Sequence, residues 1–249
     1  MSPIAAAPLL EARNLTCRFQ GVVSVNNVSL TLARNEVLGL VGPNGAGKTT
    51  LINLISGTLT PDEGEVWFEG TRIDRLLPFR RAYLGIARTF QVMKPFPGLS
   101  VLENVTVGAL FGKDGGTLSR ERARESAREW LAFTGLDRHV NQRAEALGGP
   151  DRKRLELAKA LAMRPSLLLL DEVMAGLNAS EVDEVIEVIR KIRGRGVGIL
   201  VVEHVMRAIR RLSDRVMVLH HGEKIAEGGV DAVFANPVVV EAYLGKRRA

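Results

Sequence analysis

The chain has 249 residues, and its globular composition, 46% hydrophobic and 25% charged, excludes a disordered protein. A formal net charge of +6 favours an anionic partner, such as a nucleotide, a nucleic acid or a membrane surface, without choosing among them. No uncharged stretch approaches the roughly 18 apolar residues of a membrane-spanning helix. The N-terminus lacks the positive segment of a secretory signal, and the single cysteine, Cys17, cannot form an internal disulfide. We therefore expect a soluble cytosolic protein.

The first third of the chain is rich in predicted strands. Residues 9–41 read as β-rich, with turn-forming residues at Asn26-Asn27 and Arg34-Asn35. A helix is expected over residues 48–55, because its apolar residues follow helical spacing and a glycine follows shortly after. Residues 64–73 indicate a short hairpin around Glu69-Gly70.

The middle of the chain has a different pattern. Residues 92–163 read as helical, and the alternation of strand and helix resumes at Leu167. From there the patterns predict a strand at 167–170, a helix at 180–193, a strand at 196–203, a helix at 205–212 and a hairpin at 216–228. The overall pattern is an α/β core interrupted by a helical insertion.

A glycine-rich segment follows the apolar run VLGLV and precedes the first predicted helix. It fits the phosphate-loop pattern G-x-x-x-x-G-K-[ST], in which backbone N–H groups and the helix N-terminus point at a phosphate. Lys48 is expected to bridge the β- and γ-phosphates, and Thr49 to offer its hydroxyl to Mg²⁺. ATP should therefore contact Gly42, Pro43, Asn44, Gly45, Ala46, Gly47, Lys48, Thr49 and Thr50.

Two acids, Asp171 and Glu172, come directly after the apolar residues 167–170. In a phosphate-loop protein, an acid at this place serves Mg²⁺, and a second acid can polarise the attacking water. Strand alternation directs the two side chains to opposite sides, so they need not share a role. We expect Asp171 at the metal and Glu172 as the general base.

The order of these motifs resembles the ATP-binding-cassette (ABC) ATPases, from about Leu9 to the C-terminus. The resemblance implies an α/β fold with a P-loop NTPase core, an N-terminal antiparallel β subdomain and an inserted α-helical subdomain. It implies one ATPase domain over residues 9–249. The core would comprise about 9–91 and 164–249, and the helical subdomain about 92–163.

The resemblance also implies roles for single residues. Phe19 matches the aromatic residue that stacks on adenine, and Gln91 matches the glutamine that links the Mg²⁺ of the nucleotide to the helical subdomain. His204 matches the histidine that contacts the γ-phosphate and takes part in catalysis with Glu172 and Lys48. Without the family resemblance, Phe19 could equally be a core residue. Gln91 would be interpreted as a surface residue, and His204 as a residue at the start of a helix.

The segments LSVLENVTVGAL, SDRVMVLHHGEKIAEG and VVEAYLGK narrow the resemblance to the ATP-binding subunits of branched-chain amino acid importers. Such chains work as homo- or heterodimers beneath two transmembrane permease subunits, on the cytoplasmic face of the inner membrane. A periplasmic binding protein supplies the solute. The groove that receives the permease is expected near residues 92–110, where Phe96, Pro97 and Leu99 are apolar.

The signature loop departs from the family pattern L-S-G-G-Q. The matching residues are Leu147, Gly148, Gly149, Pro150 and Asp151, so a serine hydroxyl and a glycine N–H are lost and a negative charge is added. One lost donor in a dry site can cost roughly 10² to 10³ in rate. The N–H groups of Gly149 and Asp151, at the start of a helix, can still face the ATP of a second cassette.

Three functions follow from these patterns. The first is the ATPase subunit of an importer. The second is an ABC ATPase acting on nucleic acid, disfavoured because only 5% of residues are aromatic and no RNA-binding module is recognised. The third is a slowly hydrolysing nucleotide-binding subunit, suggested by Gly148 and Pro150. We expect no nucleic-acid partner.

Overall fold

The computed structural model describes residues 7–90, 95–113 and 116–244. Much of the first 72 residues forms an antiparallel sheet in the order β2-β1-β4-β5. Its strands are β1 (Leu10–Phe19), β2 (Val22–Leu32), β4 (Glu63–Phe68) and β5 (Thr71–Arg72). The predicted hairpin around Glu69-Gly70 is confirmed, since it joins β4 to β5.

A second sheet has six strands in the order β10-β9-β3-β8-β7-β6, and all its neighbours are parallel except β9 and β10. Its strands are β3 (Val37–Val41), β6 (Ile86–Arg88), β7 (Leu167–Asp171), β8 (Gly198–Val202), β9 (Arg215–His220) and β10 (Glu223–Gly228). Parallel strands bring their carboxyl ends to one edge, which is where ligands bind in open α/β sheets. Asp171 is the last residue of a strand that ends at this edge, and the phosphate loop and the segment containing His204 follow two others.

The parallel strands are buried on both faces, which explains their continuous apolar runs. Successive side chains of β7 pack in different apolar cores, one on each face of the six-stranded sheet. Leu167 and Leu169 pack in a core with α1 and the antiparallel sheet, whereas Leu168 and Leu170 pack with the helices of the opposite face.

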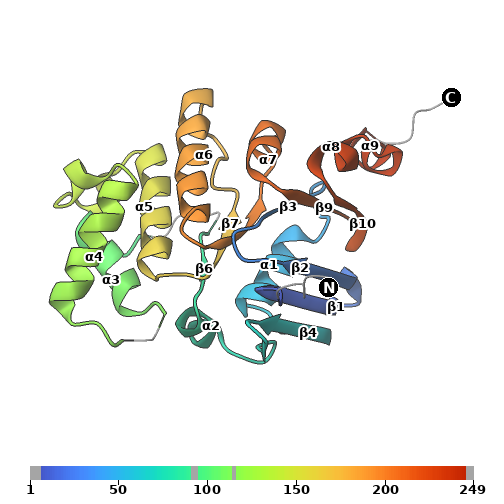
Figure 1. The fold of residues 1–249 in the computed structure, drawn as a ribbon, viewed down its shortest axis with the longest axis horizontal. Helices are drawn as coiled ribbons and strands as arrows, with labels where there is room; N and C mark the ends of the chain where they lie inside the picture. Colours follow the sequence, from blue (N-terminus) through green and yellow to red (C-terminus); the bar gives the residue numbers. More distant parts are fainter. Residues whose placement is uncertain (1–6, 91–94, 114–115, 245–249) are drawn as a thin grey trace, which may run out of the picture.

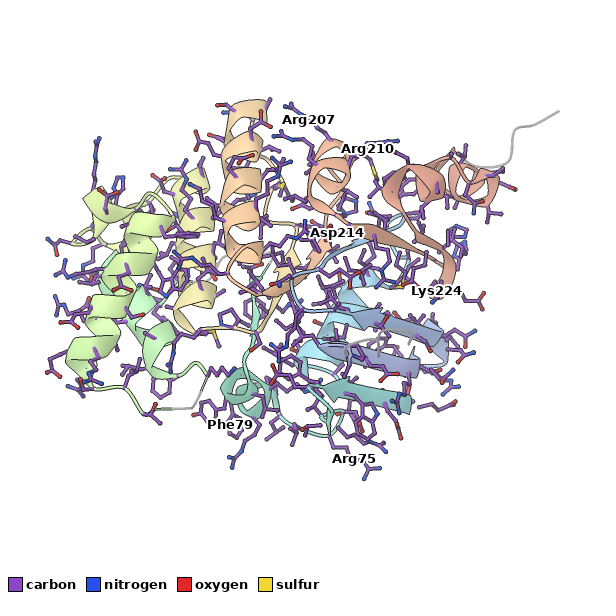
Figure 2. The ribbon with its side chains drawn as sticks, in the orientation of Figure 1. Arg75, Phe79, Arg207, Arg210, Asp214 and Lys224 are labelled. Carbon is purple, nitrogen blue, oxygen red and sulfur yellow. The ribbon has the colours of Figure 1, made fainter. Side chains whose placement is uncertain are left out.

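The helices surround this sheet unequally. Those of the core are α1 (Lys48–Ser56), α2 (Pro78–Leu84), α6 (Ala179–Arg193), α7 (Met206–Leu212), α8 (Val230–Phe234) and α9 (Pro237–Leu244). Figure 1 shows α6 and α7 on one side of the sheet and the antiparallel strands toward the other. Side chains of Arg207 and Arg210 project from α7, far from Phe79 of α2 and from Arg75 (Figure 2).

A group of helices occupies the end of the molecule opposite the antiparallel sheet (Figure 1). It comprises α3 (Val101–Leu110), α4 (Arg120–Phe133), the 3-10 turns η1 (Asp137–His139) and η2 (Ala144–Ala146), and α5 (Gly149–Ala162). These helices share their own apolar cluster, which includes Val105, Leu131 and Leu155. Helix α5 also contributes Leu157 and Leu161 to the core between the six-stranded sheet and helices α6 and α7. It therefore connects the group of helices to the sheet.

One sequence-based expectation is wrong. Asn26 and Asn27 do not form a turn between strands, because β2 runs without interruption from Val22 to Leu32. Asn27 has a φ of 51° within an irregular stretch of the β1–β2 pairing, and its N–H donates to Thr16 Oγ1. The two asparagines therefore lie at an irregularity inside the sheet. Asn27 adopts a positive φ there, and asparagine tolerates a positive φ in a turn for the same reason.

The sequence patterns also missed several short elements, namely α2, β6, α8 and α9. Across the described residues, no helix has the length and apolarity needed to cross a bilayer.

Candidate functional site

The glycines of the phosphate loop are required by close backbone contacts. Gly42 and Gly47 have φ values of 154° and 101°. A Cβ atom on Gly42 would lie 2.1 Å from the carbonyl oxygen of Leu219, and one on Gly47 would lie 2.4 Å from that of Ser24. Any larger residue would push the loop away from strands β9 and β2, so the tight curl depends on glycine at both positions.

Lys48 begins α1 and is buried within this loop. Its Nζ atom donates to the carbonyl oxygens of Gly42 at 2.8 Å and Pro43 at 2.9 Å. Burial lowers the pKa of Lys48, and the charges of Glu172 and Asp171 partly oppose this effect. The ammonium group is thus held at the loop, with both acids near enough to influence it.

A cavity of about 210 Å³ joins the phosphate loop to residues from distant parts of the chain. Its walls are formed by Ser24, residues 44–50, Glu172 and His204. Ser24 Oγ lies 2.8 Å from Thr50 Oγ1, which ties β2 to the start of α1. Ser24 could not be identified from the sequence, because nothing in the local pattern shows that β2 passes the loop.

Glu172 and His204 meet at the edge of the sheet. The register pairs Asp171 with Val202, and the N–H of Glu172 donates to the carbonyl of Val202 at 2.9 Å. Glu172 leaves the strand with a φ of 52°. Its Oε1 atom lies 2.7 Å from His204 Nε2, facing the phosphate-loop cavity. The structure therefore brings together Lys48, Glu172 and His204, the three residues predicted for catalysis.

Asp171 faces a different space from Glu172. It is buried and forms an ion pair with Arg88, whose Nη2 atom lies 2.8 Å from Asp171 Oδ2. Arg88 also donates to Asn53 and Ser56 of α1. Arg88 was not identified from the sequence, because its partners lie 32 to 83 residues away along the chain.

Thr49 and Asp171 line a second cavity of about 530 Å³. Their hydroxyl and carboxylate oxygens are of the kind that Mg²⁺ prefers. Within the described ranges, no group of three or more His, Cys, Asp or Glu residues is arranged to hold a metal. Mg²⁺ usually takes one or two protein oxygens and completes its shell with water and substrate phosphates. Gln91, the third expected metal residue, lies outside the described residues.

Phe19 ends β1 and is 44% exposed, so it is not a core residue. An exposed aromatic ring at this place is available for stacking against a base.

The signature loop lies at the start of α5. Gly148 precedes the helix, Gly149 and Pro150 are its first residues, and Asp151 lies in the first turn. The carboxylate of Asp151 faces Arg154 at 3.4 Å and His139 at 3.8 Å. Added Cβ atoms at Gly148 and Gly149 would meet nothing within 4 Å, so this surface of the chain is open.

Comparisons with known families and proteins agree with this geometry. The family model described as "ABC transporter" matches residues 25–175, and "Branched-chain amino acid ATP-binding cassette transporter" matches residues 223–249. The high-affinity branched-chain amino acid transport ATP-binding protein LivG of Salmonella typhimurium is 37% identical, over 96% of this chain and 98% of its own. The corresponding protein BraF of Pseudomonas aeruginosa is 35% identical over the same shares.

Solved structures show the same fold. A nucleotide-free ATP-binding cassette from an ABC transporter has a TM-score of 0.86 and 29% identity, covering 96% of this chain and all of its own. The ADP conformation of MJ1267, also an ATP-binding cassette of an ABC transporter, has a TM-score of 0.86 and 31% identity with the same coverage. The predicted α/β fold and family are confirmed: the chain belongs to the ABC transporter family, as one of its ATP-binding, ATP-hydrolysing subunits.

Proposed function

We propose that this chain powers an importer of branched-chain amino acids or similar small polar solutes. The cavity that joins the phosphate loop to Glu172 and His204 carries the proposal, because it combines groups for binding a triphosphate with a base for its hydrolysis. The solute class is supported by the family match at residues 223–249 and by the names of LivG and BraF.

ATP would bind with its phosphates in the loop from Gly42 to Thr50. Lys48 would exchange its bonds with the carbonyls of Gly42 and Pro43 for bonds with the β- and γ-phosphates. The N-terminus of α1 adds partial positive charge at the same point. The exposed ring of Phe19 would stack on adenine.

Glu172 would act as the general base. Its carboxylate borders the cavity, where it can accept a proton from a water molecule aligned with the γ-phosphate. His204 holds that carboxylate through Nε2 at 2.7 Å and would itself reach the γ-phosphate. The histidine thus holds the base in one orientation. Less entropy is then lost when the carboxylate and the attacking water reach their reactive arrangement.

Thr49, Asp171 and Gln91 would hold Mg²⁺. The ion, when bound, neutralises charge on the phosphates and orients them. Arg88 keeps the carboxylate of Asp171 in place by its ion pair.

The partners would be a second ABC ATPase subunit, transmembrane permease subunits and, indirectly, a periplasmic binding protein. A permease segment would dock against the apolar residues of the cavity of about 530 Å³, which include Phe90, Phe96, Phe111 and Met163, and not against Thr49 and Asp171 of the same cavity. Three of these are exposed phenylalanines, with 43% to 56% of each exposed. Exposed apolar surface of this kind marks a protein interface. Phe79 of α2 is also an exposed phenylalanine at the surface (Figure 2).

This arrangement would place the chain on the cytoplasmic face of the inner membrane. Residues 9–249 would act as one ATPase domain, in which a helical subdomain at about 92–163 moves relative to a core at about 9–91 and 164–249. ATP would close the dimer, and hydrolysis would reopen it.

A slower or asymmetric ATPase is a second candidate, favoured by the signature loop. Pro150 is the second residue of α5 and has no N–H, and Gly148 has no hydroxyl. A partner cassette's ATP would therefore receive its donors only from Gly149 and Asp151.

The test is reconstitution with the transmembrane permease subunits of a branched-chain amino acid importer. Leucine, isoleucine or valine with the binding protein should stimulate ATP hydrolysis, and Glu172→Gln should abolish the stimulation. Stimulation by RNA instead, together with co-purification with RNA, would support the nucleic-acid alternative and contradict the importer.

A further inference from the structure

A buried carboxyl group, that of Glu203, directly precedes His204 of the Glu172–His204 pair. Glu203 is the residue between β8 and His204, and only 1% of it is exposed. A buried acid is costly unless hydrogen bonds and opposite charge compensate it. The groups that contact Glu203 therefore indicate its role.

A backbone N–H group points at this carboxylate. The N–H of Met174 donates to Glu203 Oε1 at 2.8 Å, in a bond that is itself buried. Met174 belongs to the loop that follows Glu172, and Glu203 directly precedes His204, the residue that contacts Glu172. The single side chain thus connects both segments that form the hydrolytic pair.

Helix α5 supplies the compensating charge. Lys153 attracts the Glu203 carboxylate, and its Nζ atom donates to the carbonyl of Ala175 in the same loop. Lys153 lies two residues after Asp151 of the signature loop. The contacts therefore run from the start of α5, through the loop after Glu172, to Glu203, the residue before His204.

We propose that Glu203 is a positioning residue for ATP hydrolysis, fixing the loop after Glu172 against the His204 segment and linking both to the signature helix through Lys153. A carboxylate suits this role because its negative charge strengthens the bond from the Met174 N–H and attracts Lys153. Glutamine has nearly the same shape but no charge, so both interactions would weaken. Aspartate keeps both oxygens but is shorter by one methylene group.

The proposal rests on the proposed hydrolytic function, and the experiment separates the two. Glu203→Gln, Glu203→Asp and wild type are compared in the complete transporter, and amide hydrogen exchange is measured on each full-length chain. The matched control is Asp74→Asn, which alters a buried acid in the antiparallel-sheet part of the chain.

We expect kcat of Glu203→Gln to fall about tenfold while KM for ATP changes less than twofold, since the phosphate loop is untouched. Glu203→Asp should recover part of the lost rate. The amide of Met174 should exchange at least tenfold faster in Glu203→Gln, with the strand amides of β3 unchanged. Asp74→Asn should change neither kcat nor the exchange of the Met174 amide.

Several results would overturn the proposal. Wild-type kcat in Glu203→Gln, or unchanged exchange at Met174, would show that the carboxylate does not hold the loop. An equal loss of kcat in Asp74→Asn would show a general effect of removing a buried acid. Absence of ATP hydrolysis in the wild type would instead refute the proposed function, before any variant is compared.

Discussion

His204 Nε2 lies 2.7 Å from Glu172 Oε1, although 32 residues separate them in the sequence. The parallel pairing of β7 with β8 produces this contact, because Asp171 and Val202 are register partners and the next residues leave the sheet together. The histidine therefore positions the acid that we propose as the base.

Glu172→Gln should retain ATP binding and lose at least about 100-fold in kcat, because the amide cannot accept the proton of water. His204→Ala should also lower kcat. The double variant should be little slower than Glu172→Gln alone, since residues that act as a unit are not additive. Single-turnover hydrolysis of ATP measures all three. Additive losses would show that the two side chains act separately.

Restoring the signature loop should accelerate hydrolysis. Gly148→Ser with Pro150→Gly returns a hydroxyl and an N–H, and should raise kcat by about tenfold. Gly148→Ala is the control, because it adds a Cβ atom in the same open space without a donor. Steady-state ATPase assays of the reconstituted transporter compare them. An equal rate in all versions would mean that this loop does not limit turnover.

Arg88 should be essential for stability, because its removal leaves the carboxylate of Asp171 buried without its partner. The two side chains are 9% and 3% exposed. Arg88→Met should lower the free energy of unfolding by about 3 kcal/mol. Arg190→Met, which breaks an exposed pair with Glu187, should change it by less than about 0.5 kcal/mol. Urea unfolding distinguishes these values, and equal effects would contradict the buried-pair interpretation.

Glu203 should make stability depend on pH. Burial raises its pKa to about 7, while bonds from Met174 and the charge of Lys153 oppose the rise and Glu172 adds to it. Glu181 and Glu172 in turn face Lys153. Between about pH 4.5 and 7 the folded chain keeps a proton that the unfolded chain has released, so stability falls as pH rises through this range.

The stability difference between wild type and Glu203→Gln isolates this titration, because His204 and Lys153 are present in both. It should decline by at most about 3 kcal/mol from pH 4.5 to 7 and then level off. Urea unfolding at several pH values measures it. A flat difference, or one that increases with pH, would contradict the assigned pKa direction.

Local patterns were enough to predict the parts of the site that belong to one strand and one turn. The phosphate loop needs a strand, closely spaced glycines and a helix, and these are consecutive at residues 37–56. Asp171 ends a buried apolar strand and Glu172 follows it, so their place at the sheet edge could also be predicted.

Residues that act through tertiary contacts could not be predicted in this way. Ser24 reaches Thr50 only because β2 passes the loop, and Arg88 reaches Asp171 from the three-residue strand β6. Glu203 reads as the polar end of a strand, and only the fold shows that it is buried behind the site. Asn26-Asn27 led to the wrong prediction of a turn, because a turn favours the same residue type as an irregularity within a strand.

Nucleotide affinity of Lys48→Ala tests the central claim most directly. The claim is that the loop around Lys48 holds the triphosphate, so MgATP should bind wild type and bind Lys48→Ala at least about tenfold more weakly, through loss of charged hydrogen bonds. Lys191→Ala, on the exposed face of α6, should bind like wild type. Equal affinity of Lys48→Ala and wild type, measured by calorimetry, would contradict the claim.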